Sequence, residues 1–117
     1  MDAPIDDFLP LAPATLHILL ALAGERMHGY AIMQEILRQS NGRYKLGPGT
    51  LYDNLQRLMK QELVEEVHVS PEEETSRRRY YRLSSLGRGV LSAEIVRLEG
   101  VVRAARVHLK LPQPRRA

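Results

Sequence analysis

Apolar residues along this chain fall into four stretches with helical spacing and two short stretches with strand character. Residues 13–23 are apolar almost all round, which predicts a central helix that Pro13 opens and Gly24 ends. Residues 29–40 place apolar and polar side chains on opposite faces at a helical period. This pattern predicts an amphipathic second helix.

The stretch 45–63 predicts a third helix whose two faces differ in chemistry. Its start is marked by Pro48, which lies between two glycines and suits a first helical turn. One face is apolar, with Tyr52 at its edge, and the opposite face comprises Thr50, Asp53, Asn54, Arg57, Lys60 and Gln61. Such hydrogen-bonding groups and cations can read base edges and hold phosphates. We therefore predict a recognition helix, although a mixed polar face is more often simply solvated.

The apolar period changes after residue 61. Residues 63–69 and 78–83 are short and rich in β-branched or aromatic side chains, which predicts a hairpin with a long polar tip. Residues 24–29 are expected to form a turn. Three helices followed by two strands predict a mainly α, or α+β, fold: a winged helix-turn-helix with a two-stranded wing.

A fourth and longer helix is predicted from Ser84 or Ser85, either of which can cap it, to Leu109. Apolar residues within it follow spacings of 4, 3, 4, 3 and 4, which is a heptad seam. The seam is longer than one small core can cover, so we predict a homodimer held by this helix; the alternative is that the helix packs back across its own domain. The predicted dimerisation residues are Leu91, Ile95, Leu98, Val102, Ala105 and Leu109.

These elements predict four parts in the chain. Residues 1–11 would form an N-terminal arm whose apolar side chains pack onto the remainder, and residues 12–83 a winged-helix DNA-binding domain. Residues 84–111 would form the C-terminal dimerisation helix, and residues 112–117 a basic tail.

Charge is distributed unevenly along the chain. Residues 1–74 carry 6 Lys and Arg against 12 Asp and Glu, whereas residues 75–117 carry 11 against 2. A basic segment of this kind suits a polyanionic partner, although a solvated helix and a basic tail would account for much of it. The acidic N-terminus differs from a signal peptide, no Cys is present, and the longest apolar run is too short to span a bilayer. We therefore expect a cytoplasmic protein with no membrane partner.

No arrangement of residues typical of catalysis or metal binding appears in the sequence. The four histidines are scattered, and no P-loop or HExxH spacing occurs. His28 is interpreted as part of a helix start, and His17, inside the first apolar run, as a structural residue. We expect no enzyme activity, no cofactor and no metal.

Three segments resemble the PadR family of transcriptional regulators. LAPATLHILLALAGERMHGYAIMQEI resembles the family's opening, GPGTLYDNLQRLMKQELV its recognition helix, and SRRRYYRLSSLGRGVL its wing strand and the start of its last helix. The likeness covers about residues 11–99. The short C-terminal part resembles the small subfamily with a single dimerising helix.

The resemblance implies a dimeric bacterial repressor that binds a palindromic operator in double-stranded DNA. Members of the family are often relieved by a small aromatic or phenolic effector. The implied groove-facing residues are Pro48, Gly49, Thr50, Tyr52, Asn54 and Arg57, and the implied backbone contacts are Arg77, Arg78 and Lys45. Arg79 joins them because the three arginines fall where the wing tip returns into the second strand. The alternative function is a winged-helix protein-interaction module that does not bind DNA.

Two features depart from the family pattern, and a third opposes contact with DNA. Glu62 stands where the family usually ends its recognition helix with Gly, so the exit from that helix is expected to differ. The chain has no Trp, whereas some relatives hold aromatic effectors between Trp side chains at the dimer interface. Three consecutive glutamates, 72–74, at the predicted wing tip would repel phosphate, so the tip is expected to point away from DNA.

Overall fold

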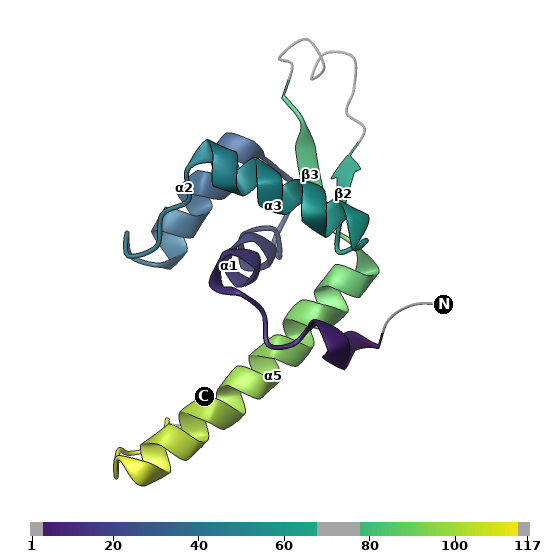
Figure 1. Cartoon of the computed structure of the whole chain (residues 1–117). Helices are drawn as coiled ribbons and strands as arrows, with labels where there is room; N and C mark the ends of the chain where they lie inside the picture. The colour runs from purple at the N-terminus through teal and green to yellow at the C-terminus, as the bar shows by residue number, and fades with distance from the viewer. Residues whose placement is uncertain (1–3, 68–77, 115–117) are drawn as a thin grey trace.

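The computed structural model describes residues 4–67 and 78–114, and it confirms a winged helix with a long C-terminal helix (Figure 1). A short 3-10 helix, η1 (Ile5–Phe8), comes first. The helices that follow are α1 (Pro13–Ala21), α2 (Gly29–Gln39), α3 (Pro48–Lys60) and α5 (Ser85–His108). The strands are β1 (Met27–His28), β2 (Val64–Val67) and β3 (Tyr80–Leu83).

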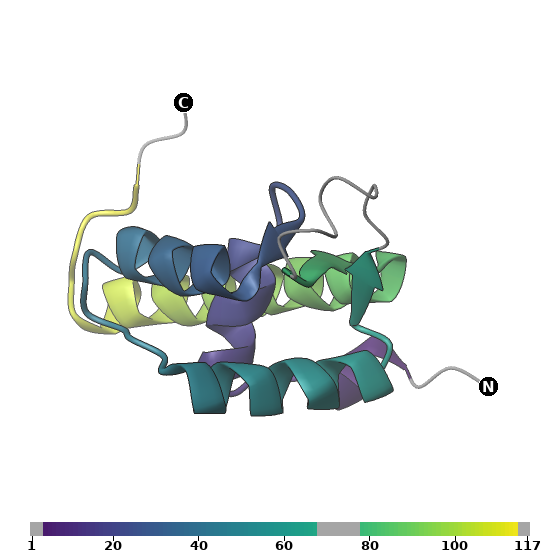
Figure 2. The same cartoon turned by 90° about the horizontal axis from the view of Figure 1, so that it is seen from above.

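The core lies where the first three helices meet the sheet. Figure 2 shows α1 crossing between α2 and α3, and its Ile18 and Leu19 are completely buried, as expected for a central helix. The third helix buries Leu51, Leu55 and Leu58 completely, which is its predicted apolar face. Because side chains at helical spacing share a face, burying these leucines turns the polar side chains of α3 outward.

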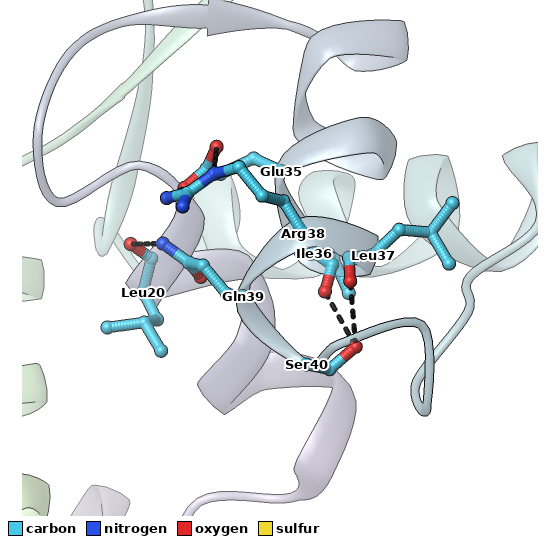
Figure 3. Close-up of polar contacts among 7 residues, drawn as sticks. All are labelled: Leu20, Glu35, Ile36, Leu37, Arg38, Gln39 and Ser40. Carbon is cyan, nitrogen blue, oxygen red and sulfur yellow. Dashed lines mark hydrogen bonds and ion pairs between the residues drawn. The ribbon is translucent and has the colours of Figure 1, made fainter.

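The turn between α2 and α3 is held by side-chain hydrogen bonds. The Ser40 hydroxyl donates to the carbonyl of Ile36 at 2.8 Å (Figure 3) and accepts from the Tyr44 amide at 3.0 Å. The Gln39 amide donates to the Leu20 carbonyl at 3.5 Å and so connects the end of α2 to α1. These bonds fix the orientation of α3 relative to the two helices beneath it.

The sheet has three antiparallel strands in the order β1-β3-β2, so the prediction of a plain turn at residues 24–29 was wrong. Met27 and His28 pair with Tyr81 and Tyr80 of β3, which in turn pairs with β2. A two-residue strand is too short to show any alternation, and it exists because β3 offers it an edge. The wing tip at residues 68–77, with the glutamates 72–74, lies outside the described residues.

The exit from α3 keeps the left-handed geometry despite the absence of Gly, so the expectation of a different exit was wrong. Glu62 adopts a φ of 63°. Its amide donates to the Met59 carbonyl at 3.0 Å, and the Leu63 amide donates to the Leu58 carbonyl at 2.9 Å, which is the Schellman pattern of a helix end. Leu63 is buried after this turn, and its burial offsets the conformational cost borne by Glu62.

The start of α5 is fixed against the end of α3. The Ser84 hydroxyl accepts from the Gly87 amide at 2.9 Å, which confirms a serine cap, and donates to the Glu62 carbonyl at 2.6 Å. A Cβ on Gly87 would lie 2.0 Å from the Leu63 carbonyl oxygen, so only glycine permits this approach. The helix therefore leaves the domain at one defined angle.

Residues 4–11 of the N-terminal arm lie along the first half of α5 (Figure 1). The Leu11 amide donates to Glu94 at 2.9 Å, and Arg97 donates to the same carboxylate at 2.5 Å and 3.0 Å. The hydrogen bonds from Arg97, with the one from Leu11, lower the pKa of this nearly inaccessible carboxyl. Beyond this point α5 extends away from the domain (Figure 1). Within the described chain, no helix has the length and apolar character needed to cross a membrane.

Candidate nucleic-acid interface

The exposed start of α3 carries several of the predicted DNA-binding residues. Pro48, Gly49 and Thr50 form the first turn of the helix and are exposed, and Lys45 is exposed just before it. Proline at the first helical position leaves no unsatisfied amide there. The helix therefore presents its N-terminal end to solvent, as a helix that enters a DNA groove must.

Further along α3, Asn54 and Arg57 belong to one chain of hydrogen bonds. The Asn54 amide donates to the Thr50 carbonyl at 2.8 Å, and Arg57 donates to the Asn54 side-chain oxygen. The same terminal nitrogen of Arg57 donates to the hydroxyl of Thr15 on α1 at 3.1 Å. Each amide side chain offers two donors and two acceptor lone pairs. Asn54 therefore keeps one of each for a base edge while it holds Arg57.

Tyr52 is directed differently from the other predicted groove-facing residues. Its hydroxyl lies at the start of α2, where a Cβ on Gly29 would be 2.3 Å from the hydroxyl oxygen. Tyr52 as a whole residue is 45% exposed. A side chain at position 29 would therefore displace the Tyr52 ring, which forms the border between the two helices.

A cleft of about 390 Å³ opens beside Tyr52, between the start of α2 and the base of the wing. Its wall combines hydroxyl groups with two guanidinium groups. The lining residues are His28, Gly29, Tyr30, Tyr52, Arg78, Arg79 and Tyr81. Burial first, and the nearby Tyr52 second, raise the pKa of Tyr81, so its hydroxyl stays a neutral donor. Such a wall suits an anion such as a backbone phosphate.

His28 connects α2 to the wing, which sequence reasoning missed. Its Nδ1 accepts from the Ala31 amide at 3.2 Å, which confirms the predicted role at a helix start. Its Nε2 lies 3.2 Å from Nη1 of Arg78, and its ring meets Tyr80 edge-on. Burial, and then the charge of Arg78, lower the pKa of His28. Only the pairing of β1 with β3 brings these groups together, and the sequence gives no signal for that pairing.

The wing arginines are exposed at the base of the hairpin. The Arg79 guanidinium lies 3.9 Å from the Glu66 carboxylate on β2. An exposed ion pair of this kind contributes little to stability. Arg78 lies beside His28, as described above, and Arg77 lies outside the described residues. Two of the three predicted arginines therefore border the same cleft as Tyr52.

The predicted seam of α5 divides into two parts. Leu91 is only 7% exposed and packs in the core of its own domain. Beyond it Ile95 is 39% and Val102 47% exposed, and Leu109 and Ala105 are also exposed. Leu98 is half-buried, and a groove of about 670 Å³ runs between this face and residues 113–114. The distal half of α5 thus carries an apolar surface that its own domain leaves uncovered.

Among the described residues, the remaining histidine and carboxylate groups form no metal site. His17 stacks on Tyr44 with ring centroids 4.2 Å apart, which fits a structural role, although its buried Nδ1 has no hydrogen-bond partner among the described residues. No three His, Asp or Glu side chains gather as metal ligands in the described parts of the chain.

Known proteins match this chain in sequence and in fold. The family model for the PadR-like transcriptional regulators matches residues 18–93. The chain belongs to the PadR-like family. It is similar to the transcriptional regulator Rv3488 of Mycobacterium tuberculosis, with 37% identity over 79% of this chain and 81% of that protein. An uncharacterised protein of Lysinibacillus sphaericus is 38% identical over 64% of this chain and 69% of its own length.

A PadR family transcription regulator from Clostridium difficile has the same fold. Its solved structure gives a TM-score of 0.69 at 21% identity and covers 84% of this chain and 99% of that chain. PadR-like proteins are transcription regulators and not enzymes. Membership therefore implies regulation through DNA binding.

Proposed function

We propose that this PadR-like protein is a dimeric repressor that binds a palindromic operator. The start of each α3 would enter a major groove, with Asn54 reading a base edge and the wing arginines on the flanking backbone. The observation that carries this proposal is the exposed polar face of α3 beside a cleft lined by Arg78 and Arg79. A regulator of this kind acts on chromosomal DNA, and hence in the cytoplasm.

The distal half of α5 supports the dimer. Exposed apolar side chains at heptad spacing are covered when a second copy of the helix packs on them. Two copies joined there would present two recognition helices to one duplex, about 34 Å apart if they follow successive turns of B-DNA. Repression would follow from occupation of the operator, and a small aromatic effector, held without Trp, would relieve it.

Selection of bound fragments from random duplex DNA tests this function. The expected result is an enriched palindrome whose half-sites are one helical turn apart, bound by two copies of the chain. A single unpaired half-site would remove the symmetric dimer from the proposal. Failure to retain any duplex at low salt would favour the protein-interaction module over a DNA-binding regulator.

A further inference from the structure

Thr15 is a buried polar residue on α1 that the DNA-facing residues do not include. Only 4% of it is exposed, because α1 is covered by the other helices. A side chain buried to this degree has no surface with which to contact a duplex. Its hydroxyl nevertheless accepts a hydrogen bond from Arg57, whose guanidinium lies at the surface of α3.

We propose that Thr15 is a positioning residue for DNA recognition: its hydroxyl, together with the Asn54 side-chain oxygen, fixes the Arg57 guanidinium in its binding orientation. This inference rests on the proposed DNA-binding function and adds to it a residue outside the interface. Thr15 acts through Arg57 and touches no nucleotide.

The geometry assigns separate tasks to the two ends of the guanidinium. One terminal nitrogen, Nη2, donates to both Thr15 and Asn54. The other terminal nitrogen, Nη1, and Nε keep their hydrogens, and each can donate a single hydrogen bond to a phosphate or base oxygen. Both bidentate edges of a guanidinium include Nη2, so Arg57 held in this way would contact DNA through single hydrogen bonds. The protein holds Arg57 through Nη2, and the N–H groups of Nη1 and Nε remain available for DNA.

Fixing Arg57 before binding strengthens the complex because a long side chain loses rotamer freedom when it is immobilised. That loss corresponds to roughly a three- to tenfold change in affinity for one side chain. With Thr15 in place, much of the ordering is complete in the free protein. Without the hydroxyl, Arg57 must be ordered during binding.

The test compares Thr15→Val with Thr15→Ser in the full-length chain. Valine keeps the shape and removes the hydroxyl, whereas serine keeps the hydroxyl and removes the methyl group. The probe is a duplex selected from random DNA by the wild-type protein, and affinity is measured by fluorescence anisotropy. We expect Thr15→Val to bind roughly three- to tenfold more weakly and Thr15→Ser to bind within about twofold of wild type.

A double-mutant cycle separates positioning from a general structural effect. In the Arg57→Ala background, Thr15→Val should cause no further loss of affinity, because the group that Thr15 positions is absent. Thermal melting of each variant reports the fold independently of DNA. An equal loss in both backgrounds would overturn the proposal, as would wild-type or tighter binding by Thr15→Val. In each of those cases the wild-type protein still binds the duplex, so the proposed DNA-binding function stands. If the wild-type protein binds no duplex, both the proposed function and the role of Thr15 are overturned.

Discussion

The third helix and the distal half of α5 are both exposed, but they expose opposite chemistry. In α3 the leucines at positions 51, 55 and 58 are completely buried, and on the outward polar face Arg57 donates to the Asn54 side chain, which donates to the Thr50 carbonyl. In distal α5 the outward face includes Ile95, Val102 and Leu109. The apolar face of α3 is buried within the domain, whereas the apolar face of distal α5 is not.

This contrast separates two kinds of partner. A hydrated, charged duplex suits a face of hydrogen-bonding groups that keep spare donors and acceptors. An apolar stripe at heptad spacing suits a second helix of the same kind, because burial of apolar surface is its main source of stability. If α3 serves DNA and distal α5 serves the second copy, a change in one surface should leave the partner of the other unaffected, apart from the avidity that the dimer supplies.

Breaking the apolar stripe should have the largest effect. In the double variant Ile95→Glu and Val102→Glu, two charges would have to be buried in the helix pair, so we expect the chain to become a monomer. Loss of the second recognition helix should weaken operator binding by at least about a hundredfold, since linked sites gain that much from avidity. Sedimentation and anisotropy titrations measure the two effects.

The matched control for the stripe is Val96→Glu. Val96 is highly exposed and lies about 100° round the helix from Ile95, away from the seam. This variant should remain a dimer and bind as wild type does. If the double variant also stays dimeric, the surface formed by Ile95 and Val102 is not the interface.

Changing the polar face of α3 should have a smaller and more specific effect. Asn54→Ala should cost about 1–3 kcal/mol of binding free energy and relax selectivity at one base pair, if Asn54 contacts a base edge. The dimer should be unaffected because no part of α5 changes. Gln34→Ala removes an exposed amide from neighbouring α2 and serves as the control. A uniform loss over all base substitutions would assign Asn54 to the backbone instead.

The sequence predicted features that depend on neighbouring residues and missed those that depend on tertiary packing. Periodicity predicted the buried leucines of α3 and the length of α5, because both depend on residues close in the chain. It did not predict β1, whose two residues pair with a strand about 50 positions later. It also missed the bond between Thr15 and Arg57 and the contact between His28 and Arg78, since tertiary packing alone brings these residues together.

The conformation of Glu62 shows a different limit. Glycine preference at a helix end is a statement about local energy, roughly 1 kcal/mol for one residue. Burial of Leu63 and the hydrogen bond from Ser84 to the Glu62 carbonyl stabilise the same turn. Tertiary contacts can therefore impose a left-handed residue where the sequence argues against it.

Removing a wing cation should weaken binding without altering selectivity. Arg78→Ala should reduce affinity on every duplex and lower the salt slope by about one unit, because one phosphate contact is lost. Arg88→Ala is the matched control, because Arg88 lies on α5 and donates to the Ala23 carbonyl at 3.2 Å. An unchanged slope for Arg78→Ala would exclude this arginine from the phosphate contacts.

The smallest effect should be a pH dependence of stability that arises at His28, the cap of α2 beside the α3 surface. The cap of α2 requires a neutral His28, since Nδ1 accepts from the Ala31 amide. Burial and the neighbouring Arg78 hold the folded-state pKa of His28 below its ordinary value of 6.5. The unfolded chain therefore takes up this proton first as the pH falls. The contribution of His28 to stability is complete above pH 6.5 and is lost as the pH falls through the lower folded-state pKa.

Replacement of His28 by Asn separates this effect from all other titrations. Asparagine caps a helix well and does not titrate in this range. Urea unfolding at a series of pH values should give a constant difference between wild type and His28→Asn above pH 6.5, and a progressive relative loss for wild type below it. Parallel curves through the acidic range would mean that the cap and the Arg78 contact are independent of the charge on His28. Any loss that both proteins share on acidification belongs to groups elsewhere, such as Glu94 on α5, whose pKa is also lowered.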